Sequence, residues 1–126
     1  MTQSALVQVI EFLEERAELV RTVEAEAEKA IETEGQRAYQ VKMEEKAELL
    51  ASLGEDAWSL TKEVEGELGE ETTQRLEQFS MSASASLRIG SVFFMSALLY
   101  PEDHQPGEPN DLETFIEDLK RRGANG

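Results

Sequence analysis

The chain contains no cysteine, and this absence excludes several kinds of chemistry at once. Without a thiol the protein can form no disulfide, no thiolate metal site and no cysteine nucleophile. Histidine is almost as scarce, because His104 is the single one in 126 residues. Zinc catalysis needs three suitable protein ligands, and a di-iron four-helix site needs two Glu-x-x-His pairs, so neither centre is supported. We therefore expect no metal and no cofactor.

Basic residues are also few. Twelve lysines and arginines against 27 aspartates and glutamates give a net charge of -15. A surface of this sign repels nucleic acid and anionic membranes, so we expect neither as a partner. The N-terminal sequence MTQSALVQVIEFLEER lacks the basic segment of a secretory signal, and the cytoplasm is the expected location. Hydrophobic residues make up 40% of the chain, which is enough for one core and a single domain over residues 1–126.

Proline is confined to one segment, since all three prolines lie between positions 101 and 109. Elsewhere, apolar residues recur at spacings of three and four, which predicts helices over about residues 3–33, 36–66 and 70–100. Gly35 marks the first expected turn, and Gly66 with Gly69 marks the second. Gly54 falls inside the second helical pattern, where it predicts either continuous helix or a bend.

The C-terminal quarter carries local signals for a loop and for the two ends of a short helix. Residues 101–109, PEDHQPGEP, predict a loop, and Asn110 with Glu113 predicts a capping box at the start of a short helix over residues 111–122. We expect Gly123 to end this helix and residues 123–126 to form a frayed tail. Short turns favour antiparallel neighbours. The expected fold is therefore all-α, an up-and-down antiparallel bundle of three long helices plus a short fourth.

Acidic residues are absent from residues 78–100, QFSMSASASLRIGSVFFMSALLY, whose only formal charge is Arg88. A membrane span is the rival interpretation. The recurring serines, the central arginine and the missing basic flank favour instead a bundle helix that is buried on several sides. Arg88 would then be buried, either paired with a neighbouring carboxylate or serving as an anchor for an anion.

A fourth helix of about 12 residues covers only ~18 Å of helices that reach ~45 Å, so part of an apolar groove is expected to stay open. A second copy of the chain is the simplest cover for such a patch, which predicts a homodimer. The alternative is that the proline-rich loop folds back over the groove. The expected interface lies on the third helix and contains Ser86, Gly90, Phe93, Phe94, Ala97 and Leu98.

Two functions remain. The first, which we favour, is a non-enzymatic helical bundle that acts through self-association or binding to another protein. The second is a small all-α bundle that hydrolyses a nucleotide with magnesium or binds a ligand. Its candidate residues are Glu45 and Glu48, which share one helical face, and Arg88 as the anion anchor. One such carboxylate pair is expected by chance among so many glutamates, and His104 is expected to be solvated in its loop.

Overall fold

The computed structural model describes residues 4–125, and of the last two only the backbone. These residues form six helices and no strand, which confirms the all-α class. The helices are α1 (Ala5–Thr33), α2 (Gln36–Ala51), α3 (Leu53–Thr61), α4 (Gly66–Ile89), α5 (Val92–Ala97) and α6 (Asp111–Asn125). Ser4 caps α1 by accepting a hydrogen bond from the Val7 amide. Gln3, where we expected this helix to begin, lies outside the described residues.

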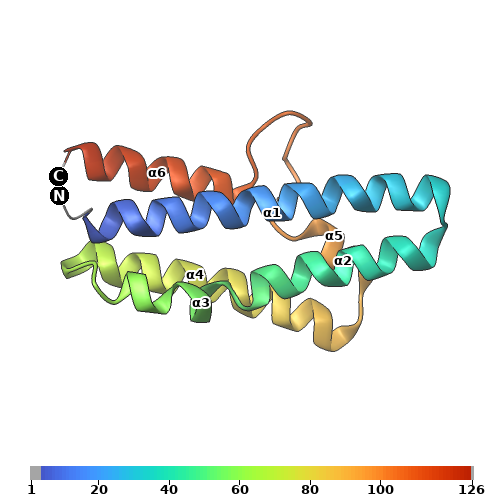
Figure 1. The fold of residues 1–126 in the computed structure, drawn as a ribbon, viewed down its shortest axis with the longest axis horizontal. Helices are drawn as coiled ribbons and strands as arrows, with labels where there is room; N and C mark the ends of the chain where they lie inside the picture. Colours follow the sequence, from blue (N-terminus) through green and yellow to red (C-terminus); the bar gives the residue numbers. More distant parts are fainter. Residues whose placement is uncertain (1–3, 126) are drawn as a thin grey trace.

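The helices pack side by side with alternating directions. α1 and α4 run one way, and α2, α3 and α6 run the other way (Figure 1). α6 packs along the first half of α1, while α5 packs against α2 and α4 farther along the molecule. The fourth position of the bundle is therefore shared by two separate helices. The expectation of three long helices is wrong, because the second and third predicted helices are each divided.

The second predicted helix divides at Ser52, where α2 ends and α3 begins. A hydroxyl from another helix is inserted into its hydrogen-bond ladder at this point. Ser80 Oγ donates to the Leu50 carbonyl at 3.1 Å and accepts from the Gly54 amide at 3.0 Å, so it replaces the direct bond between these two groups. Such an insertion is a known cause of helix kinks. The bend that we considered at Gly54 is present, and its cause lies 26 residues farther along the chain.

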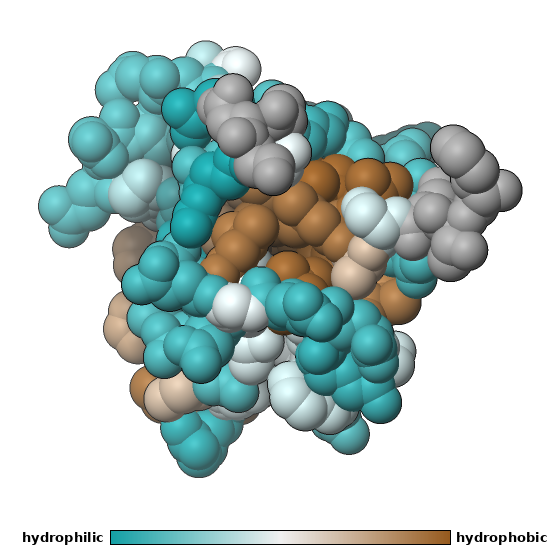
Figure 2. All heavy atoms as spheres, turned by 90° about the vertical axis from the view of Figure 1, so that its left-hand side faces the viewer, coloured by the Kyte–Doolittle hydropathy of each residue, from teal (hydrophilic) through white to brown (hydrophobic). Residues whose placement is uncertain are grey.

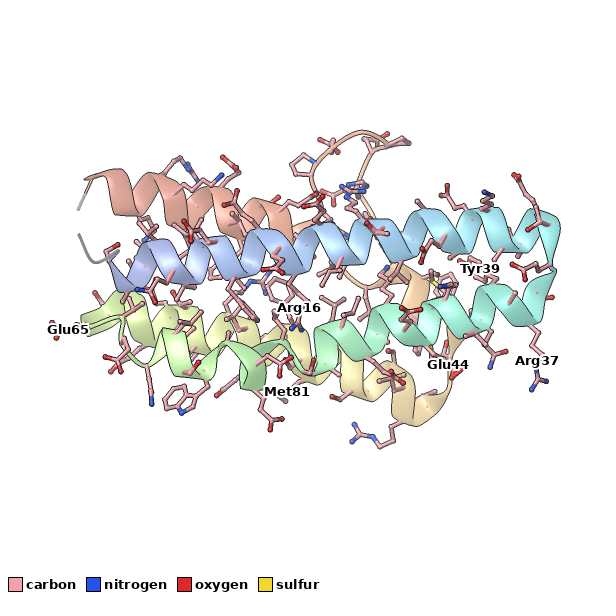
Figure 3. The ribbon with its side chains drawn as sticks, viewed as in Figure 1. Arg16, Arg37, Tyr39, Glu44, Glu65 and Met81 are labelled. Atoms are coloured by element: carbon pink, nitrogen blue, oxygen red, sulfur yellow. The ribbon has the colours of Figure 1, made fainter. Side chains whose placement is uncertain are left out.

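Arg16 supports the same break from the opposite side. Its guanidinium donates to the Leu49 carbonyl at 2.8 Å and to Ser52 Oγ at 3.3 Å, and it pairs with Asp56 at 3.0 Å. Figure 3 shows the side chain pointing from α1 toward the junction of α2 and α3. Arg16 thus satisfies a carbonyl at the end of α2 and a carboxylate in the first turn of α3.

The second turn lies earlier than we expected. The chain leaves α3 at Thr61 and re-enters helix at Gly66, so residues 62–65 make the turn and both glycines belong to α4. Gly66 has a φ of 75°, which glycine adopts without strain. Gly69 is needed for space, because a Cβ there would collide with the Val64 carbonyl oxygen.

The third predicted helix ends at Ile89 rather than near Tyr100, which corrects our expectation of one continuous helix. Gly90 adopts the left-handed conformation, with φ 74° and ψ 25°, and its amide donates to carbonyls of the last turn of α4. This is the usual glycine-based helix end. Ser91 then caps α5 by accepting from the Phe94 amide, so Gly90 and Ser91 together stop one helix and start the next.

α6 begins as predicted and ends later than predicted. Asn110 Oδ1 accepts from the Glu113 amide at 2.9 Å, and Glu113 Oε1 accepts from the Asn110 amide at 2.8 Å, which completes the capping box. Gly123 lies inside the helix, which continues to Asn125, so it is not the expected cap. It allows a close approach instead, since a Cβ there would lie 2.8 Å from Leu6 Cδ2. Gly126, the last residue of the expected tail, lies outside the described residues.

The apolar core runs along the bundle axis and reaches its end. Figure 2 looks at the end where α1 begins and α6 terminates, and it shows hydrophobic side chains surrounded by hydrophilic ones. Leu6, Leu60, Val64 and Leu68 belong to segments near this end and pack against the core. None of the helices in residues 4–125 is long and apolar enough to cross a membrane.

Candidate functional site

The six residues of the predicted interface do not share one surface. Ser86 is buried, and its hydroxyl bonds to the Ala83 carbonyl at 2.7 Å. Leu98 is half-buried and packs against the core, while Gly90, Phe93, Phe94 and Ala97 are exposed. The chain separates them by turning at Gly90, which the periodicity of the sequence did not indicate.

The open groove from which we expected a dimer is covered within the chain. α5 occupies this place, and its Met95 is 2% exposed in a small core cluster with Ala27, Met43 and Ala47. Leu99, which follows α5, is buried in the main core. Part of the expected groove is thus covered within the chain, while the homodimer stays a prediction. The covering element is a helix that precedes the proline-rich loop, not the loop itself.

The turn at Gly90 also creates an exposed apolar surface, which we call the aromatic corner and define as Ile89, Phe93 and Phe94. These side chains are 65%, 73% and 50% exposed. The two rings lie 6.0 Å apart between centroids, within the range of favourable aromatic pairs. Arg88 adjoins the corner at the end of α4 and is exposed, so our expectation that it is buried is wrong.

The residues of the alternative enzymatic reading are also at the surface. Glu45 and Glu48 are exposed on α2, and Glu45 pairs with Lys42 at 3.3 Å. Within residues 4–125, no three Asp, Glu or His side chains are grouped as metal ligands would be. His104 is half-buried rather than fully solvated, because its ring packs edge-on against Tyr100 and its Nε2 lies 3.0 Å from the Glu108 carbonyl.

A polar cluster centred on the buried Lys46, which the sequence did not reveal, lies where α1, α2, the segment after α5 and the start of α6 meet. We call it the Lys46 cluster and define it as Arg21, Glu24, Lys46, Tyr100 and Glu113. Lys46 is fully buried, pairs with Glu24 at 3.0 Å and donates to the Ser96 carbonyl at 3.0 Å. Its amine also lies 4.9 Å from the centre of the Tyr100 ring. The lysine stands among Met43, Ala47 and Leu50 of the apolar stripe, but a lysine in such a position usually extends its amine to water, so the pattern alone did not indicate burial.

The rest of the cluster ties the C-terminal elements to α1. Tyr100 donates its hydroxyl proton to Glu24 at 2.8 Å and accepts from Arg21 at 3.2 Å. Arg21 also holds Glu113 of α6 with two hydrogen bonds, at 2.6 and 3.1 Å. The two-pronged geometry gives this ion pair a fixed orientation. Through these bonds α1 fixes the residues at both ends of the proline-rich loop.

The environment shifts several pKa values in the cluster. Burial lowers the pKa of Lys46, and the nearby Glu24 carboxylate offsets this only in part. Burial also raises the pKa of Tyr100 to about 12, and the hydrogen bond to Glu24 adds to the effect. The hydrogen bond from Arg21 lowers the pKa of Glu113. Tyr100 therefore stays protonated at neutral pH and can keep donating to Glu24.

A cavity of about 380 Å³ adjoins the Lys46 cluster. Its lining residues are Arg21, Glu24, Ala25, Glu28, Tyr39, Met43, Lys46, Ser96 and Tyr100. The Lys46 amine and the Tyr100 hydroxyl are already engaged by protein groups, and the two cations face two carboxylates. The cluster is thus arranged to join helices rather than to present a free reactive group.

A second recessed surface lies between α3 and α4, and we call it the α3–α4 groove. It consists of two adjoining hollows of about 470 and 580 Å³, which share Trp58, Thr61, Thr73 and Glu77. Trp58 is 52% exposed and Met81, on α4, is 71% exposed. The buried residue Leu76 and the half-buried residues Ala51 and Val64 contribute apolar surface. The sequence alone could not show this groove, which depends on how α3 packs against α4.

No protein-family model, curated protein or solved structure matches the chain. The geometry offers three features for a functional argument: the aromatic corner, the Lys46 cluster and the α3–α4 groove. The Lys46 cluster is internally satisfied, whereas the other two expose large apolar side chains to water.

Proposed function

We propose that the protein acts without catalysis, by associating with itself through the aromatic corner. The observation that carries this proposal is the exposure of three large apolar side chains around one backbone turn, Ile89 before Gly90 and the paired rings of Phe93 and Phe94 after it. Exposed large apolar groups that gather on one surface are typical of interaction sites. Gly90 and the Ser91 cap fix the backbone on which they stand, so little ordering would be needed on binding.

A second copy is the partner that the charge distribution favours. Each chain carries a net charge of -15, so most pairs of surfaces from two copies repel each other. Residues 78–100 are the exception, because they contain no carboxylate. A two-fold axis through the corner would bring together two apolar surfaces whose own segment carries no carboxylate, and each corner would cover its twin.

The size of the corner predicts a weak dimer. Burying Ile89, Phe93 and Phe94 from both copies would remove on the order of 700 Å² of apolar surface. Stable specific interfaces usually bury more than ~1,200 Å². We therefore expect a dimer that forms at high micromolar concentration, and that strengthens with moderate salt because screening reduces the repulsion between the two chains.

Sedimentation equilibrium over a range of protein and salt concentrations tests this proposal. Phe93→Gln with Phe94→Gln should shift the protein to a monomer, while Val41→Gln on α2 should leave association unchanged. Val41 is a suitable control because it is also apolar and exposed, at 56%. A monomer at every concentration, or equal effects of the two substitutions, would refute self-association through the corner.

A further inference from the structure

We propose that the α3–α4 groove binds a basic amphipathic helix of a partner protein. This inference goes beyond self-association and uses a surface that shares no residue with the aromatic corner. Three properties of the groove carry it: its apolar lining, its uncompensated negative charge and its shape between two helices.

The apolar lining suits the hydrophobic face of such a helix. Trp58 and Met81 are exposed beside the groove, and they flank the buried side chain of Leu76. No residue of the described chain accepts a hydrogen bond from the Trp58 indole, so this group is free to meet a ligand. An exposed tryptophan next to an apolar hollow is a typical anchor at protein interfaces.

The negative charge of the groove favours a partner with positive charge. Glu55, Glu65, Glu70 and Glu77 line it, against Lys62 as its one basic residue. None of these carboxylates forms an ion pair within residues 4–125, although other carboxylates on the same helices do. Asp56 pairs with Arg16, and Glu71 pairs with Arg122. Uncompensated carboxylates around an apolar floor favour lysine and arginine on both sides of an apolar stripe. A cation that reaches the Trp58 ring would gain further from its π face.

The shape of the groove indicates a helix rather than an extended strand. α3 and α4 present a channel between packed helices, and neither has an open backbone edge to which a strand could add. α3 spans nine residues, so the channel accommodates about two and a half turns of a third helix. The expected ligand therefore carries apolar residues at positions i, i+3 or i+4, and i+7.

The chain itself offers no suitable occupant. Its helices are predominantly acidic, and its basic run, Lys120 to Arg122, is already paired. Lys120 contacts Glu14, Arg121 contacts Asp118 and Arg122 contacts Glu71. A second copy would therefore bring mainly carboxylates to a groove that already carries four. The acid-free segment of a second copy, residues 78–100, carries a single cation, Arg88, so a partner with several cations fits the four carboxylates better than another copy of this chain does.

Trp58 is the only tryptophan in the chain, so its fluorescence reports directly on the groove. The probe is a synthetic helical peptide with leucines at i, i+4 and i+7 flanked by lysines. We expect a saturable blue shift as the indole is buried, and an affinity that falls as salt is added. The same peptide with glutamates in place of the lysines should give no change, and neither should one with serines in place of the leucines.

Matched charge reversals distinguish a docking site from general attraction to an acidic protein. Glu70→Lys with Glu77→Lys should weaken binding roughly tenfold or more, because it places cations beside those of the peptide. Glu32→Lys with Glu34→Lys changes the net charge equally at the opposite end of the bundle and should have a much smaller effect (Figure 1). Circular dichroism checks that both variants remain helical. Equal weakening by both reversals, or no response of Trp58 to the basic peptide, would overturn the proposal.

Discussion

The burial of Lys46 leads to a quantitative prediction for the substitution Lys46→Met. Methionine has a similar length and no charge, so the core stays filled while the ion pair with Glu24 is lost. The Ser96 carbonyl then loses its donor, and Glu24 keeps only its hydrogen bond to Tyr100. Removing one partner of a fully buried pair destabilises proteins by about 3–5 kcal/mol.

Two features of the structure reduce that value. The Glu24 side chain is 16% exposed, so water can solvate part of its unpaired charge. Burial disfavours the charged form of Lys46, as its lowered pKa reflects, and methionine avoids this desolvation. We therefore expect Lys46→Met to lower the free energy of unfolding by about 2–3 kcal/mol. For a chain of this size the melting temperature should fall by about 6–12 °C.

Thermal and urea unfolding followed by far-ultraviolet circular dichroism measures this effect. The double substitution Glu24→Gln with Lys46→Met should recover at least half of the loss, because glutamine removes the orphaned charge and still accepts from Tyr100. A Lys46→Met protein that is as stable as the wild type would contradict this prediction. It would show that the ion pair merely balances its own desolvation.

Three further predictions follow from other parts of the structure. Gly69→Ala should destabilise the fold by about 1–3 kcal/mol in urea unfolding, because the new methyl group would collide with the Val64 carbonyl. Gly54→Ala is the control and should be neutral or stabilising, because the nearest neighbour of its methyl group would lie at an ordinary 3.4 Å. A Gly54→Ala protein that is less stable than Gly69→Ala would contradict this explanation. In a Tyr39→Phe background, where Tyr100 is the one remaining tyrosine, absorbance titration should place the pKa of Tyr100 at about 12. The free energy of unfolding should fall as pH rises from about 10 to 12, because the unfolded chain releases the tyrosine proton at a lower pH than the folded chain does. A titration midpoint near 10 would argue against the buried hydrogen bond to Glu24. Moderate salt should raise the melting temperature at neutral pH by screening the net charge of -15, whereas a flat response would mean that the ion pairs already offset the repulsion.

Local sequence signals were sufficient for some elements. The spacing of apolar residues located α1, and Asn110 with Glu113 located the start of α6, because both depend on residues within a few positions of one another. Gly90 was a local signal that we misread. We placed it in the expected interface of a continuous third helix, although a glycine followed directly by a serine can also end one helix and cap the next.

Other features had no local signal. The kink between α2 and α3 depends on Ser80 and Arg16, which are far from the junction in sequence and reach it only in the folded bundle. The same holds for Lys46, whose partners come from α1, α5 and the segment after α5. A lysine on an apolar stripe usually extends its amine to water, so its burial could not be inferred before these elements were assembled. The aromatic corner followed from a backbone turn, and the α3–α4 groove from helix packing.

The division of the fourth bundle position between α5 and α6 affects how the molecule opens. α5 is only six residues long and lies between two residues with positive φ, Gly90 at 74° and Leu99 at 76°. For a leucine that conformation costs about 1–2 kcal/mol, which is released when the segment detaches. Local openings of α5 should thus be far more frequent than global unfolding, and its amides should exchange with solvent before those of α1. Because Lys46 lies beneath this segment, each opening briefly exposes an amine that is otherwise shielded. The rate at which an amine-reactive reagent modifies Lys46 therefore measures how often α5 opens.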